Sequence, residues 1–173
     1  MKSGLRLGAA VALVGLVCGC GANYRWRPSV PADVRTVAVP TFRNESELQE
    51  VGAVAARQVL REFQREGTFK IRPVGDAALE IQGTVVSAGG GSVAYDRRSG
   101  LRISSYELTG EFSVSVIDKR AGKVLVDNRR YTARASFAVG QDLTTAQRDA
   151  SGRMAEDLAR QVVDDVLNLK WEK

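Results

Sequence analysis

The chain has 173 residues, with 25 lysines and arginines against 20 acidic residues, no histidine, and two cysteines, Cys18 and Cys20. Without histidine there is no Ser/His/Asp or Cys/His relay and no imidazole metal ligand, which excludes the commonest nucleophilic and zinc chemistries. The composition, 44% hydrophobic and 26% charged, is that of a globular domain, and a net charge of +5 does not by itself imply nucleic acid. We therefore expect no catalytic residue, no metal site and no nucleic-acid partner.

An export signal is predicted over residues 1–19. Lys2 and Arg6 lead into an apolar or small run over residues 7–17, which is too short to span a bilayer. The run ends at Cys18-Gly19-Cys20, which resembles the bacterial lipobox with Cys20 as the acylated residue. A plain secretory signal or a short anchor helix is the alternative. The expected lipid is covalent, so no dissociable cofactor is predicted.

Removal of residues 1–19 leaves 23 basic and 20 acidic residues, a net charge of +3. Residues 20–33 are then the lipidated N-terminus and a tether rich in arginine, proline and aromatic residues. No aspartate follows Cys20 directly, which favours the outer membrane over retention in the inner one. We expect a lipid-anchored protein on the periplasmic side of the outer membrane, with a single domain over residues 34–173.

The domain is expected to open with a strand and a helix. Residues 34–40 form a short β-branched run closed by proline, which is typical of a strand. A helix should follow, with Asn44 or Ser46 as its N-cap and Gly67 as its stop. Apolar residues recur within it at three- and four-residue spacing and predict one buried stripe: Leu48, Val51, Ala55, Val59 and Phe63.

A second short strand is expected over residues 69–74, parallel to the first because a helix separates them. Three strands with alternating apolar and polar residues should then pair in antiparallel fashion, centred near Ile81, Phe112 and Tyr131. The run from Gly89 to Ser92 is interpreted as a flexible turn after the first of these strands.

The chain should end in a long helix over residues 145–169, with Met154, Leu158 and Val162 on its buried stripe. Adjacent carboxylates on it, such as Asp164 and Asp165, are interpreted as a solvated face. These elements predict an α+β fold: a two-layer sandwich with a mixed, mostly antiparallel sheet and two helices on one face.

Basic residues gather at the expected ends of the sheet. Arg97, Arg98 and Arg102 lie in the connection between two strands, and Lys119 and Arg120 lie in the next turn, at the opposite end. For the second group we prefer the solubility of an exposed turn. For the first, binding of phosphate or carboxylate groups and simple exposure are equally open, because arginine binds such anions bidentately.

The order of the lipobox, the tether, the strand TVAVPTFRN, the helix, LEIQGTVV and YELTGEFSVSVIDKRAGKVLVDN resembles the LPS-assembly lipoprotein family, LptE. The resemblance implies a protein that sits as a plug in the LptD outer-membrane β-barrel, assists its assembly and contacts lipopolysaccharide. It also implies that a basic residue at Arg97 or Arg98, near Arg102, touches the lipopolysaccharide.

Two other readings remain. VAVPTFRNES is also similar to the opening of periplasmic lipoproteins that activate peptidoglycan synthases, although their long proline-rich linkers contrast with the short tether here. An enzyme that acts on envelope lipids or glycans through carboxylates is a weaker reading. Asp96, Asp118 and Asp127 are available for it, but no spacing singles out a pair.

Overall fold

The structure, a computed structural model, describes residues 30–96, 102–138 and 142–171. In chain order its elements are η2 (Ala32–Val34), β1 (Thr36–Ala38), β2 (Arg43–Asn44), α2 (Val51–Glu66), β3 (Lys70–Ile71), β4 (Leu79–Asp96), β5 (Arg102–Asp118), β6 (Lys123–Ala138) and α3 (Leu143–Leu167).

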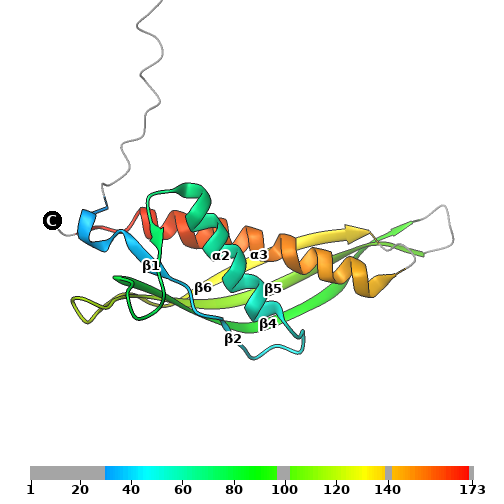
Figure 1. Ribbon diagram of the computed structural model, residues 1–173. Coiled ribbons are helices and arrows are strands. Elements are labelled where there is room, and N and C mark those ends of the chain that lie inside the picture. Colours follow the sequence, from blue (N-terminus) through cyan, green and yellow to red (C-terminus); the bar gives the residue numbers. More distant parts are fainter. Residues whose placement is uncertain (1–29, 97–101, 139–141, 172–173) are drawn as a thin grey trace, which may run out of the picture.

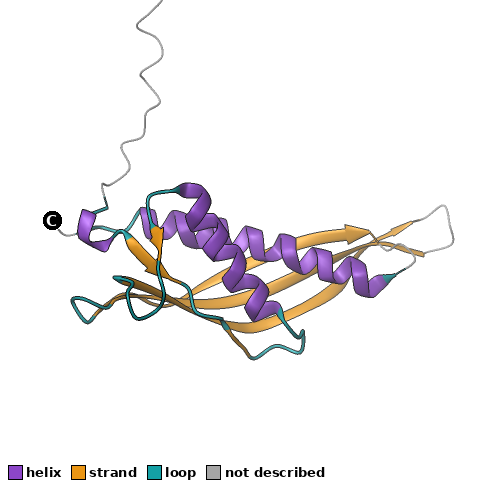
Figure 2. Cartoon of the chain, in the orientation of Figure 1, coloured by secondary structure: helices purple, strands orange, loops and turns teal. Residues whose placement is uncertain are grey.

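The strands form one mixed sheet in the order β3-β1-β4-β5-β6, with β2 pairing beside β4. Both helices lie on the same face of this sheet, as Figure 1 shows, and the colouring of Figure 2 separates the helical layer from the strand layer. The predicted α+β two-layer sandwich with a mixed, mostly antiparallel sheet is therefore confirmed.

The parallel part of the sheet is short. β1 pairs in parallel with β3 on one side, Thr36 opposite Lys70, and with the start of β4 on the other, Val37 opposite Leu79. The predicted parallel relation of the first two strands is confirmed, although β3 covers only Lys70 and Ile71 because Pro73 follows closely and cannot donate to a ladder. The two-residue strand β2 was not predicted.

The antiparallel part consists of the long strands β4, β5 and β6. On β5 the buried residues Leu108, Phe112 and Val114 alternate with more exposed polar ones, as the sequence pattern predicts. The interpretation of Gly89 to Ser92 as a turn is wrong, because these residues continue β4 and pair with β5, Gly90 opposite Leu108. The alternation disappears from the sequence there because glycine has no side chain to carry it.

Helix α2 buries the predicted stripe of Val51, Ala55, Val59 and Phe63, and Gly67 ends it with φ +83°. The predicted N-cap is wrong, because the helix begins at Val51 after Glu50 in the left-handed conformation. Asn44 instead braces the preceding loop: its Oδ1 accepts from the Ser46 N–H at 3.0 Å, and its Nδ2 donates to the Leu48 carbonyl at 2.9 Å.

Helix α3 begins two residues earlier than predicted. Asp142 caps it by accepting from the Thr144 N–H at 2.9 Å and from the Thr145 hydroxyl. Met154, Leu158 and Val162 are fully buried, as expected. The 25 residues span about 37 Å, so α3 follows the long strands for most of their length. Close packing beneath it requires Gly110, where a Cβ would lie 2.9 Å from Met154 Sδ.

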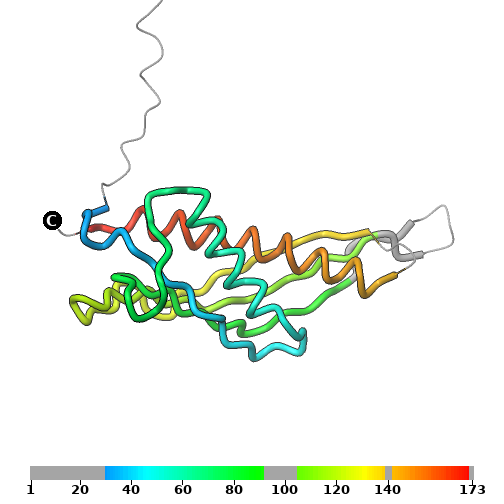
Figure 3. Tube along the Cα trace, in the orientation of Figure 1, coloured from blue at the N-terminus to red at the C-terminus, as the bar shows by residue number. Residues whose placement is uncertain are grey.

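The described N-terminal residues are packed against the domain. Val30, near the end of the expected tether, and Val34, the first residue of the expected domain, are each 3% exposed. Figure 3 shows that this segment, the β5–β6 turn and the C-terminal residues gather at one end of the domain. The described end of β4 and the start of β5 lie at the other end. We call these the turn end and the hairpin end.

Candidate functional site

The predicted lipopolysaccharide-binding residues follow β4 in the chain and lead into β5. Asp96, the last residue of β4, pairs with Arg102, the first of β5, so residues 97–101 connect the two strands. Arg97 and Arg98 belong to this connection and lie outside the described residues, and of Arg102 the structure describes only the backbone. The end of β4 and the start of β5 lie opposite the β5–β6 turn, as predicted, while the role of the three arginines stays a prediction. Cys20 also lies outside the described residues.

The last part of β4 reaches the hairpin end with little cover. Gly89, Gly90 and Gly91 are exposed. The β4–β5 hairpin extends past the first turn of α3 and past the end of β6 (Figure 1). Over Gly89 to Gly91, β4 thus presents only backbone to its surroundings.

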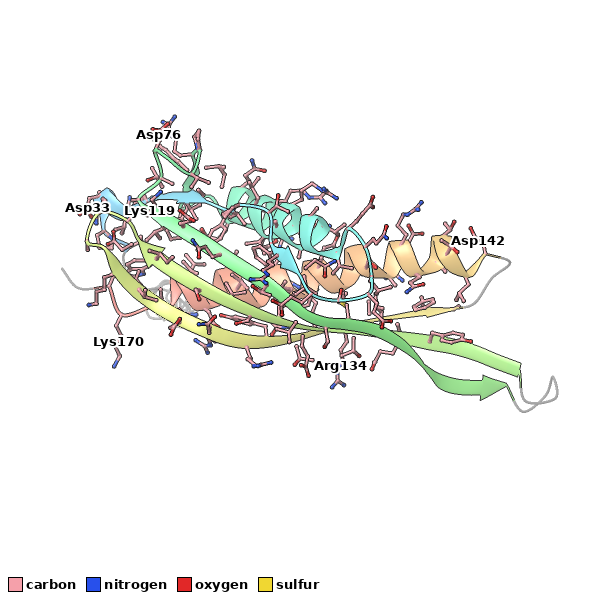
Figure 4. The ribbon with its side chains drawn as sticks, turned by 90° about the horizontal axis from the view of Figure 1, so that it is seen from below. Asp33, Asp76, Lys119, Arg134, Asp142 and Lys170 are labelled. Carbon is pink, nitrogen blue, oxygen red and sulfur yellow. The ribbon has the colours of Figure 1, made fainter. Side chains whose placement is uncertain are left out.

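At the turn end Lys119 and Arg120 are held by ion pairs. Arg120 Nη1 lies 2.6 Å from Asp33 Oδ2, and its Nη2 lies 3.4 Å from Asp118 Oδ2. Lys119 Nζ lies 3.3 Å from Glu80 Oε2 and donates to the Val74 carbonyl at 2.7 Å. Figure 4 shows Asp33 and Lys119 together at this end. These side chains fasten the turn to the start of the domain, so their role is structural.

The pairing also changes the ionisation of the exposed partner. Its hydrogen bond with Arg120 holds the pKa of the Asp33 carboxyl below its usual value. Asp118 is 7% exposed and accepts from the backbone N–H groups of Arg120 and Ala121 at 3.0 and 3.2 Å. Asp118 therefore organises the turn, which argues against the weaker reading of it as a catalytic carboxylate. Asp127, another carboxylate of that prediction, accepts a hydrogen bond from the Asn128 side-chain Nδ2 at 2.8 Å.

A cleft of about 510 Å³ opens at the turn end, between the N-terminal segment, the β5–β6 turn and the last described residues. Val124, Leu169 and Trp171 contribute apolar walls, and Arg120 and Lys170 contribute charge. Because this cleft lies at the opposite end of the domain from Arg102, it is separate from the predicted arginine site.

Polar contacts that were not predicted from the sequence join β6 to α3. The Tyr131 hydroxyl donates to Asp165 Oδ2 at 2.7 Å, and Arg129 Nε lies 3.2 Å from the same oxygen. Burial, together with the hydrogen bond to Asp165, raises the pKa of the Tyr131 phenol. The interpretation of Asp164 and Asp165 as one solvated face is thus half wrong: Asp164 is exposed, whereas Asp165 fastens the helix to the sheet.

The sheet face away from the helices is polar. A shallow groove of about 440 Å³ crosses it, lined by side chains from four strands or their connections: Arg43, Gln82, Thr84, Ser113, Ser115 and Asn128. These groups can form hydrogen bonds but include no nucleophile with an adjacent base. The groove is therefore suited to contact with a polar surface.

Among residues 30–96, 102–138 and 142–171, no three His, Cys, Asp or Glu side chains come together in a way that could hold a metal ion. Within the same residues no helix is long and apolar enough to cross a membrane.

Solved structures that are similar to this chain have low sequence identity. A hypothetical protein from Chlamydia trachomatis is 14% identical with a TM-score of 0.52, and covers 78% of this chain and 96% of its own. A protein from Xanthomonas campestris is 13% identical with a TM-score of 0.52, and covers 79% and 88% respectively. The rare lipoprotein B from Shewanella oneidensis is 14% identical with a TM-score of 0.47, and covers 76% and 92%. None of the curated proteins matches the chain.

The sequence model of the LptE family, described as lipopolysaccharide-assembly, matches residues 34–166. This span contains both helices and all strands of the sheet, apart from the last residue of α3. The match therefore rests on the whole folded domain and not on one motif. The chain belongs to the LptE family, a non-enzymatic family of envelope lipoproteins of lipopolysaccharide assembly.

Proposed function

We propose that this protein is an outer-membrane lipoprotein, anchored through Cys20, that assists the assembly of lipopolysaccharide at the cell surface. In this proposal it acts as plug and partner of an LptD-like β-barrel and contacts lipopolysaccharide itself. The observation that carries the proposal is the family match over residues 34–166. The competing prediction, an activator of a peptidoglycan synthase, rests on the similarity of VAVPTFRNES alone.

The polar outer face of the sheet supports a position inside a large barrel. The interior of a wide outer-membrane barrel is polar, so a plug needs hydrogen-bonding groups and not an apolar patch on the surface that meets it. The groove lined by Gln82, Thr84, Ser113 and Ser115 offers such groups. The helices cover the apolar face, which leaves the core sealed within the monomer.

Contact with lipopolysaccharide is assigned to the hairpin end. Guanidinium groups bind phosphate groups bidentately, and Arg97, Arg98 and Arg102 are close together in the sequence at the junction of β4 and β5. At the turn end Arg120 is paired with Asp33 and Asp118, and Lys119 is paired with Glu80. These two side chains are therefore less suited to bind a lipopolysaccharide phosphate.

The anchor keeps the domain near the membrane. Residues 20–30 span at most about 40 Å when fully extended, because each of the eleven residues adds no more than about 3.6 Å. Since Val30 is already buried in the domain, this is the largest separation between the acylated cysteine and the fold. The reach suits a partner in the same membrane and not one across the periplasm.

The experiment is purification of the full-length tagged protein from detergent-solubilised envelopes, followed by mass spectrometry of the bound proteins. We expect one large outer-membrane β-barrel in a 1:1 ratio, and lipopolysaccharide in the same fraction. The Cys20→Ser variant serves as the matched control that separates membrane anchoring from partner binding. Recovery of a peptidoglycan synthase in place of a barrel would overturn the proposal.

A further inference from the structure

The outer sides of β4 and β6 differ along the long antiparallel part of the sheet, and α3 covers the outer side of β6. Three side chains of α3 bind its outward-facing backbone groups: Gln161 Nε2 donates to the Thr132 carbonyl at 3.1 Å, Asp157 Oδ2 accepts from the Arg134 N–H at 3.4 Å, and Arg153 Nη2 donates to the Ser136 carbonyl at 3.1 Å.

The spacing of helix and strand explains why these contacts repeat. Positions four apart on a helix are about 6 Å apart along its axis, and positions two apart on a strand are about 6.6 Å apart. Residues 153, 157 and 161 therefore keep step with residues 136, 134 and 132 of the antiparallel strand. Figure 4 shows Arg134 midway along the domain, where α3 runs beside β6. Along this part of the edge the Thr132 and Ser136 carbonyls and the Arg134 N–H already have partners on α3, so they are not available to another strand.

The β4 edge is open over residues 87–91. On the side away from β5, β4 pairs with β1 at Leu79 and Glu80 and with β2 at Thr84 and Val85. Beyond Val85 no described strand pairs with it on that side, and Gly89, Gly90 and Gly91 are exposed. Residues 87–91 contain no charge, no proline and no bulky side chain, the usual devices that keep a sheet edge from pairing.

The register identifies which backbone groups of this open edge face outward. The Val85 carbonyl accepts from the Glu45 N–H at 2.9 Å, so the backbone N–H and C=O of Val85 point away from Phe112, its partner on β5. Gly110 and Leu108 follow Phe112 at two-residue steps, so their partners Ala88 and Gly90 also face away from β5. Closure of the β6 edge at Thr132, Arg134 and Ser136 fits the same alternation across the sheet.

We propose that the open edge of β4, residues 87–91, binds an extended strand of the barrel partner by β-strand addition. The inference rests on the proposed function, since it names the surface by which that partner is held. The N–H and C=O groups of Ala88 and Gly90 would pair with the added strand. The absence of side chains at three successive glycines lets the strand of the partner approach without a steric or electrostatic conflict.

A second copy of the chain is a poorer occupant than a large partner. A stable interface needs about 800 Å² from each side. Two open edges paired with each other would bring only serine, alanine and glycine together, on five residues each. A strand that belongs to a large protein can add side-chain contacts beyond the edge itself.

Amide hydrogen exchange on the purified complex and on the free protein tests the pairing. We expect the peptide that contains residues 87–91 to exchange at least about tenfold more slowly in the complex, because the Ala88 and Gly90 amides gain acceptors. The matched control is the peptide around Arg134, whose N–H is already bound to Asp157, and it should not change.

Two substitutions at one position complete the test. Gly90→Pro removes an outward N–H without touching the β4–β5 ladder, and we expect it to weaken barrel binding about tenfold at an unchanged melting temperature. Gly90→Ala is the control: its Cβ would meet only Glu107 O at 3.8 Å and Leu108 Cδ1 at 3.9 Å, so binding should be kept.

The outcomes separate this inference from the proposed function. A complex whose residues 87–91 gain no protection, and which Gly90→Pro does not weaken, overturns strand addition and leaves the proposed function in place. If residues 87–91 are already protected from exchange in the free protein, and that protein has the mass of a dimer, the edge pairs with a second copy and the proposed strand addition is overturned. Absence of any barrel overturns both.

Discussion

The hydrogen bond between Tyr131 and Asp165 joins the middle of β6 to α3, and the cost of its loss can be worked out. Tyr131 is 8% exposed, and its hydroxyl lies 2.7 Å from the carboxylate. A hydrogen bond to a charged group contributes about 1.5–3 kcal/mol. Asp165 is 29% exposed and keeps Arg129 as a partner. We therefore expect Tyr131→Phe to lower the free energy of unfolding by about 1.5 kcal/mol, the low end of the range.

The pH dependence follows from the raised pKa of Tyr131. Burial and the Asp165 contact raise it above the ordinary value of 10.0, so above pH 10 the unfolded chain loses the phenol proton while the folded chain keeps it. The stabilisation is thus fully present below pH 10 and declines as the pH rises. Between pH 8 and pH 11 the decline is about 1.4 kcal/mol. The phenylalanine variant lacks this titration, so the two proteins should be nearly equally stable at pH 11.

Urea unfolding of the non-lipidated Cys20→Ser protein, with and without Tyr131→Phe, measures both effects. In the Asp165→Asn background the same substitution should cost clearly less, because the charged acceptor is gone. A difference between the two proteins that stays the same from pH 8 to pH 11 would refute the assignment of the Tyr131 proton to this contact.

Three further predictions concern packing, capping and ligand binding. Gly110→Ala should cost about 1–3 kcal/mol in urea unfolding, because its Cβ would lie 2.7 Å from Phe112 Cε2, whereas Gly89→Ala meets nothing within 4 Å and should be tolerated. Asp142→Ala should lower the melting temperature because the helix loses its N-cap, whereas Asp142→Asn should keep the cap. The hydrogen bond with Thr145 lowers the pKa of Asp142. The difference in melting temperature between wild type and Asp142→Ala should therefore shrink as the pH falls below about 4. Arg97→Glu with Arg98→Glu should weaken lipopolysaccharide binding about tenfold or more. Arg57→Glu with Arg61→Glu, on the exposed face of α2, changes the charge equally and should have little effect. Equal losses of affinity in a lipopolysaccharide titration would contradict the assignment of binding to Arg97 and Arg98.

The periodic parts of the fold could be predicted because burial shows directly in the sequence. The buried stripe of α2 and the alternation around Phe112 and Tyr131 each reflect one face turned to the core. The prediction of a turn from Gly89 to Ser92 was wrong for the same reason. This part of β4 is specified by its pairing with β5, and residues without side chains show no alternation of buried and exposed positions.

The polar contacts across elements could not be predicted. The closure of β6 by Arg153, Asp157 and Gln161 depends on α3 running beside that strand, which only the tertiary fold determines. The four-residue spacing of these polar side chains was the signal available in the sequence. Likewise, nothing in the sequence near Asp33 indicates that Arg120 will be its partner.

The central claim is that this protein serves lipopolysaccharide assembly, and depletion in its native host tests it most directly. The measurement is the amount of lipopolysaccharide on the cell surface as the protein is removed, with restoration by wild type and by the Arg57→Glu/Arg61→Glu control. We predict that surface lipopolysaccharide and the folded barrel partner decline together. Unchanged surface lipopolysaccharide, with altered cross-linking of peptidoglycan, would contradict the claim.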